Sequence, residues 1–240
     1  MTIAIIIAVC LVVLISALLV GVTVASKRFY RISMAPRNVP PGKSVDPRKE
    51  KRVVVQQDTT ETDADTQWFD EHSSDNWYVS SGDGLKLHAY SISSPANKNW
   101  VIVFHGYSGN ARKMAVFCRN FYERGFNVLA PDARGYAGSE GDRISMGWYE
   151  RFDVILWINE IIRKYPEAGI VLFGVSMGGA TIMMASGEKL PSNVKVIVED
   201  CGYTSLWDLF SHLVKTAHHL PAFPIMDFTN HLAKKTWAFP

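Results

Sequence analysis

The sequence predicts an α/β domain with a mostly parallel β-sheet flanked by helices, and two observations indicate this. Short, near-continuous apolar runs alternate with helical stretches, which is the order expected for a parallel sheet wrapped by helices. Most of the runs are apolar on both faces, as strands covered from both sides should be, whereas Leu85, Leu87 and Ala89 alternate along the second strand. The expected strands cover residues 77–79, 85–89, 100–104, 126–130, 170–173 and 194–198.

Helices are expected between and after these strands. The clearest covers residues 147–165, and others are expected at 178–188 and 206–220. The last of these begins with a plausible capping box formed by Ser205 and Asp208. Apolar residues at helical spacing in the first helix predict its sheet-facing stripe as Trp148, Phe152, Ile155, Ile158 and Ile162.

A separate apolar segment opens the chain. Residues 3–25 carry no charge, and as a helix they would be about 35 Å long, enough to cross a hydrocarbon core of about 30 Å. We expect residues 1–26 to be a retained single-pass anchor in the cell membrane, in contact with lipid. A cleaved signal peptide is the alternative, although the segment is long for one and no Lys or Arg precedes it.

Charges that follow the apolar segment bear on its orientation. Lys27, Arg28, Arg31 and Arg37 favour a cytoplasmic domain, with the extracellular side left open. Residues 27–75 are expected to form a charged, Pro-containing linker that is basic in its first half and acidic in its second. It would either lie on anionic lipid or act as a solvated tether. The α/β domain is expected at 76–240.

Composition excludes several other classes. The chain has 240 residues, 48% of them hydrophobic and 20% charged, and a formal net charge of +2, so no global field recruits nucleic acid. The three cysteines are scattered and form no disulfide framework. Because zinc-ligand and P-loop spacings are absent from the sequence, we expect neither a metal nor another cofactor.

A glycine-flanked serine carries the chemistry. The sequence Gly174-Val-Ser176-Met-Gly178 directly follows one expected strand and directly precedes an expected helix. A turn this tight requires glycine at both flanks, and it would hold Ser176 above the sheet as a nucleophile, beside the N-terminus of the helix. An ordinary serine in a glycine-rich junction is the alternative.

Three segments together resemble the serine α/β hydrolases, in particular membrane-anchored bacterial hydrolases related to serine aminopeptidase S33-like domains. They are residues 103–109, 131–138 and 172–180. The resemblance covers residues 76 to about 235. It implies an α/β-hydrolase fold and hydrolysis of esters, thioesters or amides, in a small-molecule or peptide acyl substrate, through an acyl-serine intermediate.

In this fold, backbone N–H groups form the oxyanion hole, and the candidates are those of Tyr107 and Met177. His105, in the loop after the strand at 100–104, is interpreted as shaping that loop rather than as the base. Asp132 and Arg134 are interpreted as bracing the loop after the next strand.

The expected triad is incomplete in the sequence. The resemblance puts the acid after a seventh strand and the histidine after an eighth, and neither strand is recognised, so we expect a C-terminally truncated domain with impaired catalysis and an unprotected edge at the sixth strand. Asp200 is an alternative acid. None of the histidines that follow Ser176 is placed as a base: His212 and His219 lie on a polar helix face, His218 borders the apolar stripe of that helix, and His231 lies in an unpatterned tail. A non-catalytic, membrane-tethered binding or scaffold module is therefore the second hypothesis.

Overall fold

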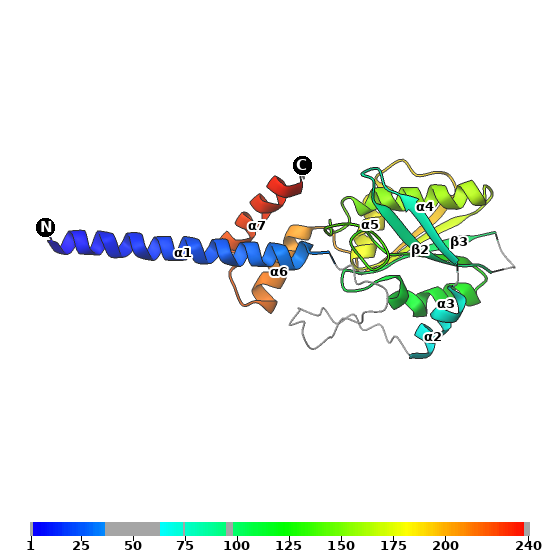
Figure 1. The fold of residues 1–240 in the computed structure, drawn as a ribbon, viewed down its shortest axis with the longest axis horizontal. Coiled ribbons are helices and arrows are strands. Elements are labelled where there is room, and N and C mark those ends of the chain that lie inside the picture. The colour runs from blue at the N-terminus through cyan, green and yellow to red at the C-terminus, as the bar shows by residue number, and fades with distance from the viewer. Residues whose placement is uncertain (1, 37–62, 74, 95–97, 238–240) are drawn as a thin grey trace. The chain divides into compact units, whose positions relative to one another are not determined.

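The computed structural model describes most of the chain, and the chain forms two compact units. One unit, residues 35–204, holds the β-sheet, and the other joins residues 1–34 to residues 205–240 (Figure 1). The residues that the structure describes are 2–36, 63–73, 75–94 and 98–237.

The sheet has six strands in the order β1-β2-β4-β3-β5-β6. Strands β4, β3, β5 and β6 run parallel to one another, while β1 and β2 form an antiparallel extension at one side. The prediction of an α/β domain with a mostly parallel sheet is thus confirmed. The strands are β1 (Asp75–Ser80), β2 (Lys86–Ile92), β3 (Trp100–Phe104), β4 (Asn127–Pro131), β5 (Ile170–Val175) and β6 (Val194–Asp200).

Helices cover both faces of the sheet (Figure 1). One face packs against α4 (Glu150–Lys164) and α5 (Met177–Ser186), and the other against α2 (Asp63–His72), the 3-10 helix η1 (Ala111–Met114) and α3 (Ala115–Glu123). The position of β3 between two layers of helices explains why its sequence is continuously apolar. Its alternate residues point to opposite faces, so Trp100 and Ile102 enter one core cluster while Val101 and Val103 enter the other.

Helix α4 does not bury the stripe that was predicted for it. Its buried residues are Glu150, Asp153, Val154, Trp157, Ile158 and Ile161, whereas Phe152 is exposed and Ile155 and Ile162 are only partly buried. Two acidic residues occupy the first turns of the buried stripe, because partners from other segments hold their carboxylates there. The periodicity of apolar residues alone could not reveal this.

The segments before the sheet also differ from the expected boundaries. Helix α1 (Thr2–Met34) extends beyond residue 26, and α2 forms inside the expected linker, with Phe69 fully buried in the core. Residues 37–62 and 74 of the linker lie outside the described residues, and so does most of the basic half that was predicted to lie on lipid. Among the described helices, α1 is the one long and apolar enough to cross a membrane.

Strand β6 forms one edge of the described sheet. Its residues from Lys195 to Asp200 are exposed, including Val196 and Val198. This agrees with the predicted exposure of the sixth strand. The helices that follow it, α6 (Leu206–Ala217) and α7 (Ala222–Trp237), belong to the other compact unit.

A buried ion pair fixes the loop after β4. Arg134 donates two hydrogen bonds, of 2.8 and 2.7 Å, to the carboxylate of Asp153 on α4, and it also pairs with Asp83 in the β1–β2 turn. The side chains of Arg134 and Asp153 are only 7% and 8% exposed. Arg134 therefore joins three segments that are distant in sequence, and this agrees with the bracing role expected for it.

Burial and charge act in opposite directions on this pair. Burial raises the pKa of Asp153 to about 6, although the neighbouring Arg134 lowers it. Burial lowers the pKa of Arg134, but the carboxylates of Asp153, Glu150 and Asp83 raise it further, so the net direction is upward. At neutral pH both groups are charged, and each depends on the other.

Replacing Arg134 should expose this dependence. In Arg134→Met, Asp153 keeps a buried carboxylate without its cation, and we expect a loss of about 3–5 kcal/mol in the free energy of unfolding. When folding raises the pKa of a carboxyl group, its protonated form stabilises the folded state at low pH. This contribution is lost as the pH rises through the pKa in the folded state. The deficit should therefore be largest near pH 8 and shrink towards pH 5.

Chemical unfolding of the full chain in detergent, followed by circular dichroism at several pH values, measures this deficit. Arg163→Met is the matched control, because Arg163 pairs with Glu160 on the same helix but is 67% exposed. The control should change stability by no more than about 0.5 kcal/mol. An equal loss in both variants, or a deficit that does not vary with pH, would contradict the assignment.

Candidate functional site

Ser176 lies at the sharp turn between β5 and α5. Its φ is 54° and its ψ is −113°, a left-handed conformation that is rare for any residue with a side chain. The residue is only partly buried, so its hydroxyl is not sealed in the core. The turn is held by hydrogen bonds from the Ser176 amide to the Asp200 carbonyl, at 2.7 Å, and from the Ala180 amide to the Ser176 carbonyl, at 2.9 Å.

The glycines on either side of Ser176 are required by space. A Cβ on Gly174 would lie 2.5 Å from the backbone carbon of Gly178, and a Cβ on Gly178 would lie 2.3 Å from the carbonyl oxygen of Phe104. Both contacts are with backbone atoms that cannot move aside. The start of α5 therefore lies directly against the carboxyl end of β3, which brings the serine turn and the loop after β3 together.

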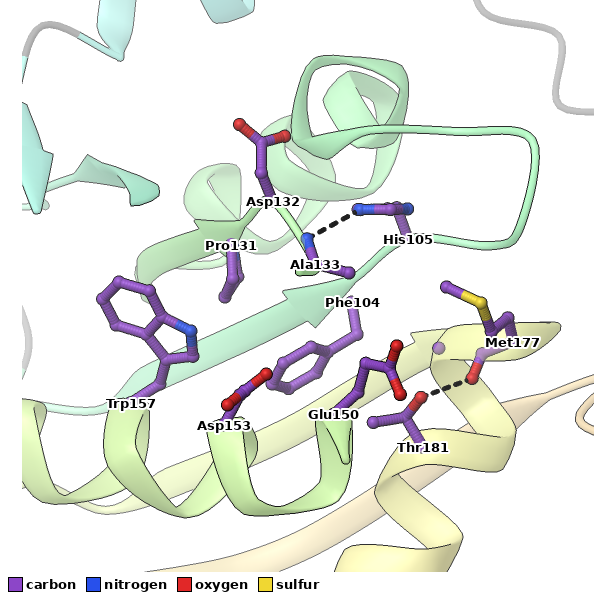
Figure 2. A pocket seen from close by; sticks show the side chains of 11 residues that line it. Phe104, His105, Pro131, Asp132, Ala133, Glu150, Asp153, Trp157, Met177 and Thr181 are labelled. Atoms are coloured by element: carbon purple, nitrogen blue, oxygen red, sulfur yellow. Dashed lines mark hydrogen bonds between the residues drawn. The ribbon is translucent and has the colours of Figure 1, made fainter. Parts of the chain in front are cut away.

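That loop is shaped by His105. The Nδ1 atom of His105 lies 2.8 Å from the Gly106 carbonyl, and its Nε2 atom accepts a hydrogen bond of 3.0 Å from the Ala133 amide (Figure 2). The ring is therefore neutral, with its proton on Nδ1, and burial lowers the pKa of His105. Both nitrogens are used within the scaffold, which agrees with the structural role expected from the sequence.

Tyr107 and Met177, the two candidate oxyanion donors, meet at the side chain of Tyr136. The Tyr136 hydroxyl donates a hydrogen bond of 2.7 Å to the Tyr107 carbonyl and lies 3.9 Å from the Met177 sulfur. Met177 is the first residue of α5, so the helix itself offers its amide no partner. Tyr136 is 1% exposed and thus holds the Tyr107 peptide firmly.

Asp132 joins several segments beneath these loops. Its carboxylate accepts hydrogen bonds from the amides of Ala111 and Gly138, and it lies 2.9 Å from Nδ1 of His88. The other ring nitrogen of His88 lies 2.7 Å from Oδ1 of Asn76. This buried Asp–His pair resembles part of a catalytic triad in its chemistry, but all of its contacts are structural.

A small pocket lies behind the serine turn (Figure 2). Glu150, Asp153 and Trp157 approach it from α4, facing Met177 and Thr181 of α5. The Glu150 carboxylate is satisfied by the Ser145 hydroxyl and by the amides of Ser145 and Gly147. The two acids were missed by sequence reasoning, although their spacing from Val154 and Trp157 places them on the buried stripe.

The partners that would activate Ser176 are not assembled in the described part of the sheet-containing unit. The described histidines there are His72, His88 and His105, and none of them hydrogen-bonds Ser176. Asp200 ends β6 in an exposed position and meets Ser176 through its backbone carbonyl, not through its carboxylate. Among the described residues, no group of three or more His, Cys, Asp or Glu is arranged to hold a metal ion.

Comparison with known proteins identifies the family. A family model described as serine aminopeptidase, S33, matches residues 95–222, which is more than half of the chain. The chain belongs to this family of α/β hydrolases. The matched range includes the loop after β3, the loop after β4 and the serine turn, the three segments on which the resemblance rested.

Individual relatives of this S33-family chain are distant. It is 22% identical over 167 residues to the uncharacterized protein YqkD of Bacillus subtilis, covering 69% of this chain and 55% of the relative. It is 29% identical over 94 residues to a monoglyceride lipase of Rattus norvegicus, covering 38% of this chain and 31% of the lipase. The chain therefore spans about half the length, or less, of these curated relatives.

Solved structures agree on the fold. An esterase from Pyrococcus furiosus superposes with a TM-score of 0.53 at 24% identity, covering 65% of this chain and 60% of the esterase. A second structure of that esterase gives a TM-score of 0.54 at 21% identity, covering 68% and 63%. At this level of identity the likeness supports the α/β-hydrolase fold alone.

The contact between the serine turn and β3 can be tested in this S33-family domain with Gly178→Ala. Alanine is favoured over glycine inside a helix by about 1 kcal/mol, so propensity alone predicts a gain. The clash with the Phe104 carbonyl should outweigh it, since overpacking costs about 1–3 kcal/mol or more. We expect the midpoint of thermal unfolding to fall by several degrees.

Gly82→Ala is the matched control, because a Cβ there meets no atom within 4 Å. Differential scanning fluorimetry of the full chain in detergent compares the two variants. If Gly178→Ala melts at or above the temperature of the parent protein, the close approach of α5 to β3 is not the constraint described above.

Proposed function

We propose that this chain is a membrane-anchored serine hydrolase that cleaves an ester, thioester or amide through an acyl-serine intermediate, with Ser176 as nucleophile. The observation that carries the proposal is the strained, partly exposed Ser176 between β5 and α5, where the start of α5 lies against the carboxyl end of β3. Strained conformations of this kind concentrate at functional sites. The similarity to a monoglyceride lipase favours an ester among the three substrate classes.

The proposed chemistry has two stages. The Ser176 oxygen attacks the acyl carbonyl carbon, its proton passes to a base, and the alcohol, thiol or amine leaves. Water then releases the acyl group from the serine. In both stages the amides of Tyr107 and Met177 stabilise the negative charge on the carbonyl oxygen, and the positive end of the α5 dipole adds to this effect.

The anchor in this proposal is α1. Residues 3–20 are exposed and, apart from Ser16, apolar, on a helix of hydropathy suited to a bilayer. Lys27, Arg28 and Arg31 follow the span and favour a cytoplasmic location for the rest of the chain. A signal sequence would be removed by processing, so the mass of the mature protein distinguishes the two.

A fluorophosphonate probe tests the nucleophile, because it reacts only with an activated serine hydroxyl. We expect covalent labelling of the full chain in detergent and its loss in Ser176→Ala. The matched control is Ser186→Ala, since Ser186 is exposed on the same helix and hydrogen-bonds only the Met183 carbonyl. Mass spectrometry of the labelled peptide identifies the modified residue, and labelling that persists in Ser176→Ala would refute the assignment.

A second function, a non-catalytic tethered binding or scaffold module, is favoured by one observation. In the described part of residues 35–204, no histidine is hydrogen-bonded to Ser176. The pH dependence of labelling separates the two functions. A histidine base gives a labelling rate that rises with pH around about 6.5 and then levels off. A serine without a base is labelled slowly, at a rate that keeps rising with the hydroxide concentration. If the chain is a scaffold, Ser176→Ala should also leave its biological role unchanged.

Tyr136 should affect the reaction without contacting substrate. Tyr136→Phe removes the hydrogen bond that holds the Tyr107 peptide, so the oxyanion donor loses its alignment. Because losing a whole oxyanion donor costs about 10²–10³ in rate, we expect a smaller loss of about 10-fold in the acylation rate. Substrate binding should change little. Stopped-flow acylation by an activated ester measures the acylation rate and the binding of the substrate. Tyr78→Phe is the control because Tyr78 is 50% exposed. Equal rates in Tyr136→Phe and the parent would contradict this role.

A further inference from the structure

The helical unit gives α1 two different surroundings along its length. Residues 3–21 are exposed, whereas a stripe near the carboxyl end is buried at Ser26, Phe29, Ser33 and Met34. The spacing of that stripe keeps all four residues on one side of the helix. The membrane-length part of α1 is thus followed directly by a part that packs against protein.

The packing partners are α6 and α7. The hydroxyl of Ser26 donates a buried hydrogen bond of 3.0 Å to the carbonyl of Ile225 in α7. The Phe29 ring packs edge-on against Phe210 of α6, with centroids 5.3 Å apart, and against His218, at 5.8 Å. The buried side chains Val214, Ile225, Met226 and Thr229 complete the contact surface of these helices.

The length of the exposed part of α1 indicates where the contact between Ser26 and Ile225 lies relative to the surface of a bilayer. Nineteen helical residues, 3–21, span about 28 Å, close to the hydrocarbon thickness of about 30 Å. Ser26 follows the last residues of the apolar run, so its partner Ile225 lies just outside the hydrocarbon. The beginning of α7 and the turn before it are then at the level of the lipid headgroups.

The α6–α7 turn is taken as residues 218–224, which include the first residues of α7 because Phe223 departs from helical φ and ψ, and it is unusually apolar for an exposed segment. Phe223 is 76% exposed and Leu220 is 41% exposed, and both lie within five residues of Ile225. Lys27 and Arg28 are exposed on α1 at the same level. Exposed aromatic and aliphatic side chains next to basic ones are the combination that binds a lipid–water interface. In Figure 1, α7 leads away from this turn towards the same end as the carboxyl end of α1.

We propose that the α6–α7 turn, residues 218–224, inserts Leu220 and Phe223 into the surface of the same bilayer that α1 crosses. These side chains would contact the boundary between the headgroups and the acyl chains of an anionic phospholipid membrane. The exposed apolar surface of the turn is then continuous with the lipid-facing surface of α1. The helical unit is then an interfacial collar around the aqueous end of the anchor. This inference rests on the proposed membrane anchor and is independent of catalysis by Ser176.

Site-directed spin labelling of the full chain tests the collar. Nitroxide labels are attached singly at native Cys10, at Phe223→Cys and at Lys234→Cys, each in a background where the other exposed cysteines, Cys10 or Cys201, are replaced by serine. The protein is reconstituted in vesicles of phosphatidylcholine and phosphatidylglycerol. Collision rates with oxygen and with a water-soluble nickel chelate then report the depth of each label.

We expect the label at Cys10 to be deep in the bilayer and the label at 223 to collide more with oxygen than with nickel, at a depth of about 5–10 Å. Lys234 is exposed near the other end of α7, and its label should prefer nickel. Raising the fraction of phosphatidylglycerol should deepen the label at 223 and leave that at 234 unchanged.

The three labels separate the possible failures. An aqueous label at Cys10 would overturn the anchor and the collar with it. A lipid-exposed label at Cys10 with an aqueous label at 223 would overturn the collar alone. A label at 223 that is immobile and shielded from both reagents would also overturn it, because the turn would then be covered by protein, such as a second copy of the chain.

Discussion

The close approach of α5 to the carboxyl end of β3 is the contact on which the candidate site depends. A single β-carbon at Gly178 would lie 2.3 Å from the Phe104 carbonyl, so the helix reaches this position only with glycine there. Ser176 has a positive φ in this turn, and the start of α5 lies next to Phe104 and His105, where the loop that carries Tyr107 begins. The positions of the proposed nucleophile and of the start of α5 thus follow from one steric constraint.

Buried polar groups hold the loops that surround the candidate site. Asp132 and Arg134, in the loop after β4, each bind several partners from distant segments, and Glu150 holds Ser145 and Gly147 just before α4. A loop conformation that separates a buried charge from its partner costs several kcal/mol of free energy, so few alternative conformations of these loops are tolerated. Charges that take no part in the proposed chemistry thus hold the loops after β3 and β4 in place.

Local signals made much of this predictable from the sequence. Most of the strands were readable as short apolar runs, and β2 as an alternation of apolar and polar residues. The serine turn was readable because steric crowding leaves glycine as the only residue that fits at 174 and 178. The buried face of α4 was not readable, since it depends on Arg134 from another segment holding Asp153. Nor was the contact of Ser26 with Ile225, which joins residues 199 positions apart. Periodicity shows that a helix has a buried face but not what covers it.

The conformation of Ser176 bears on the choice between hydrolase and scaffold. A non-glycine residue at a positive φ of 54° costs about 1–3 kcal/mol in strain. Glycine at this position would keep the same turn, the same hydrogen bond to the Asp200 carbonyl and the same packing of α5, and it would relieve the strain. A domain that used the fold only as a scaffold gains nothing from a serine here. The strain is explained if the hydroxyl itself is used, and this favours the hydrolase even though the base for Ser176 is not among the described residues around it.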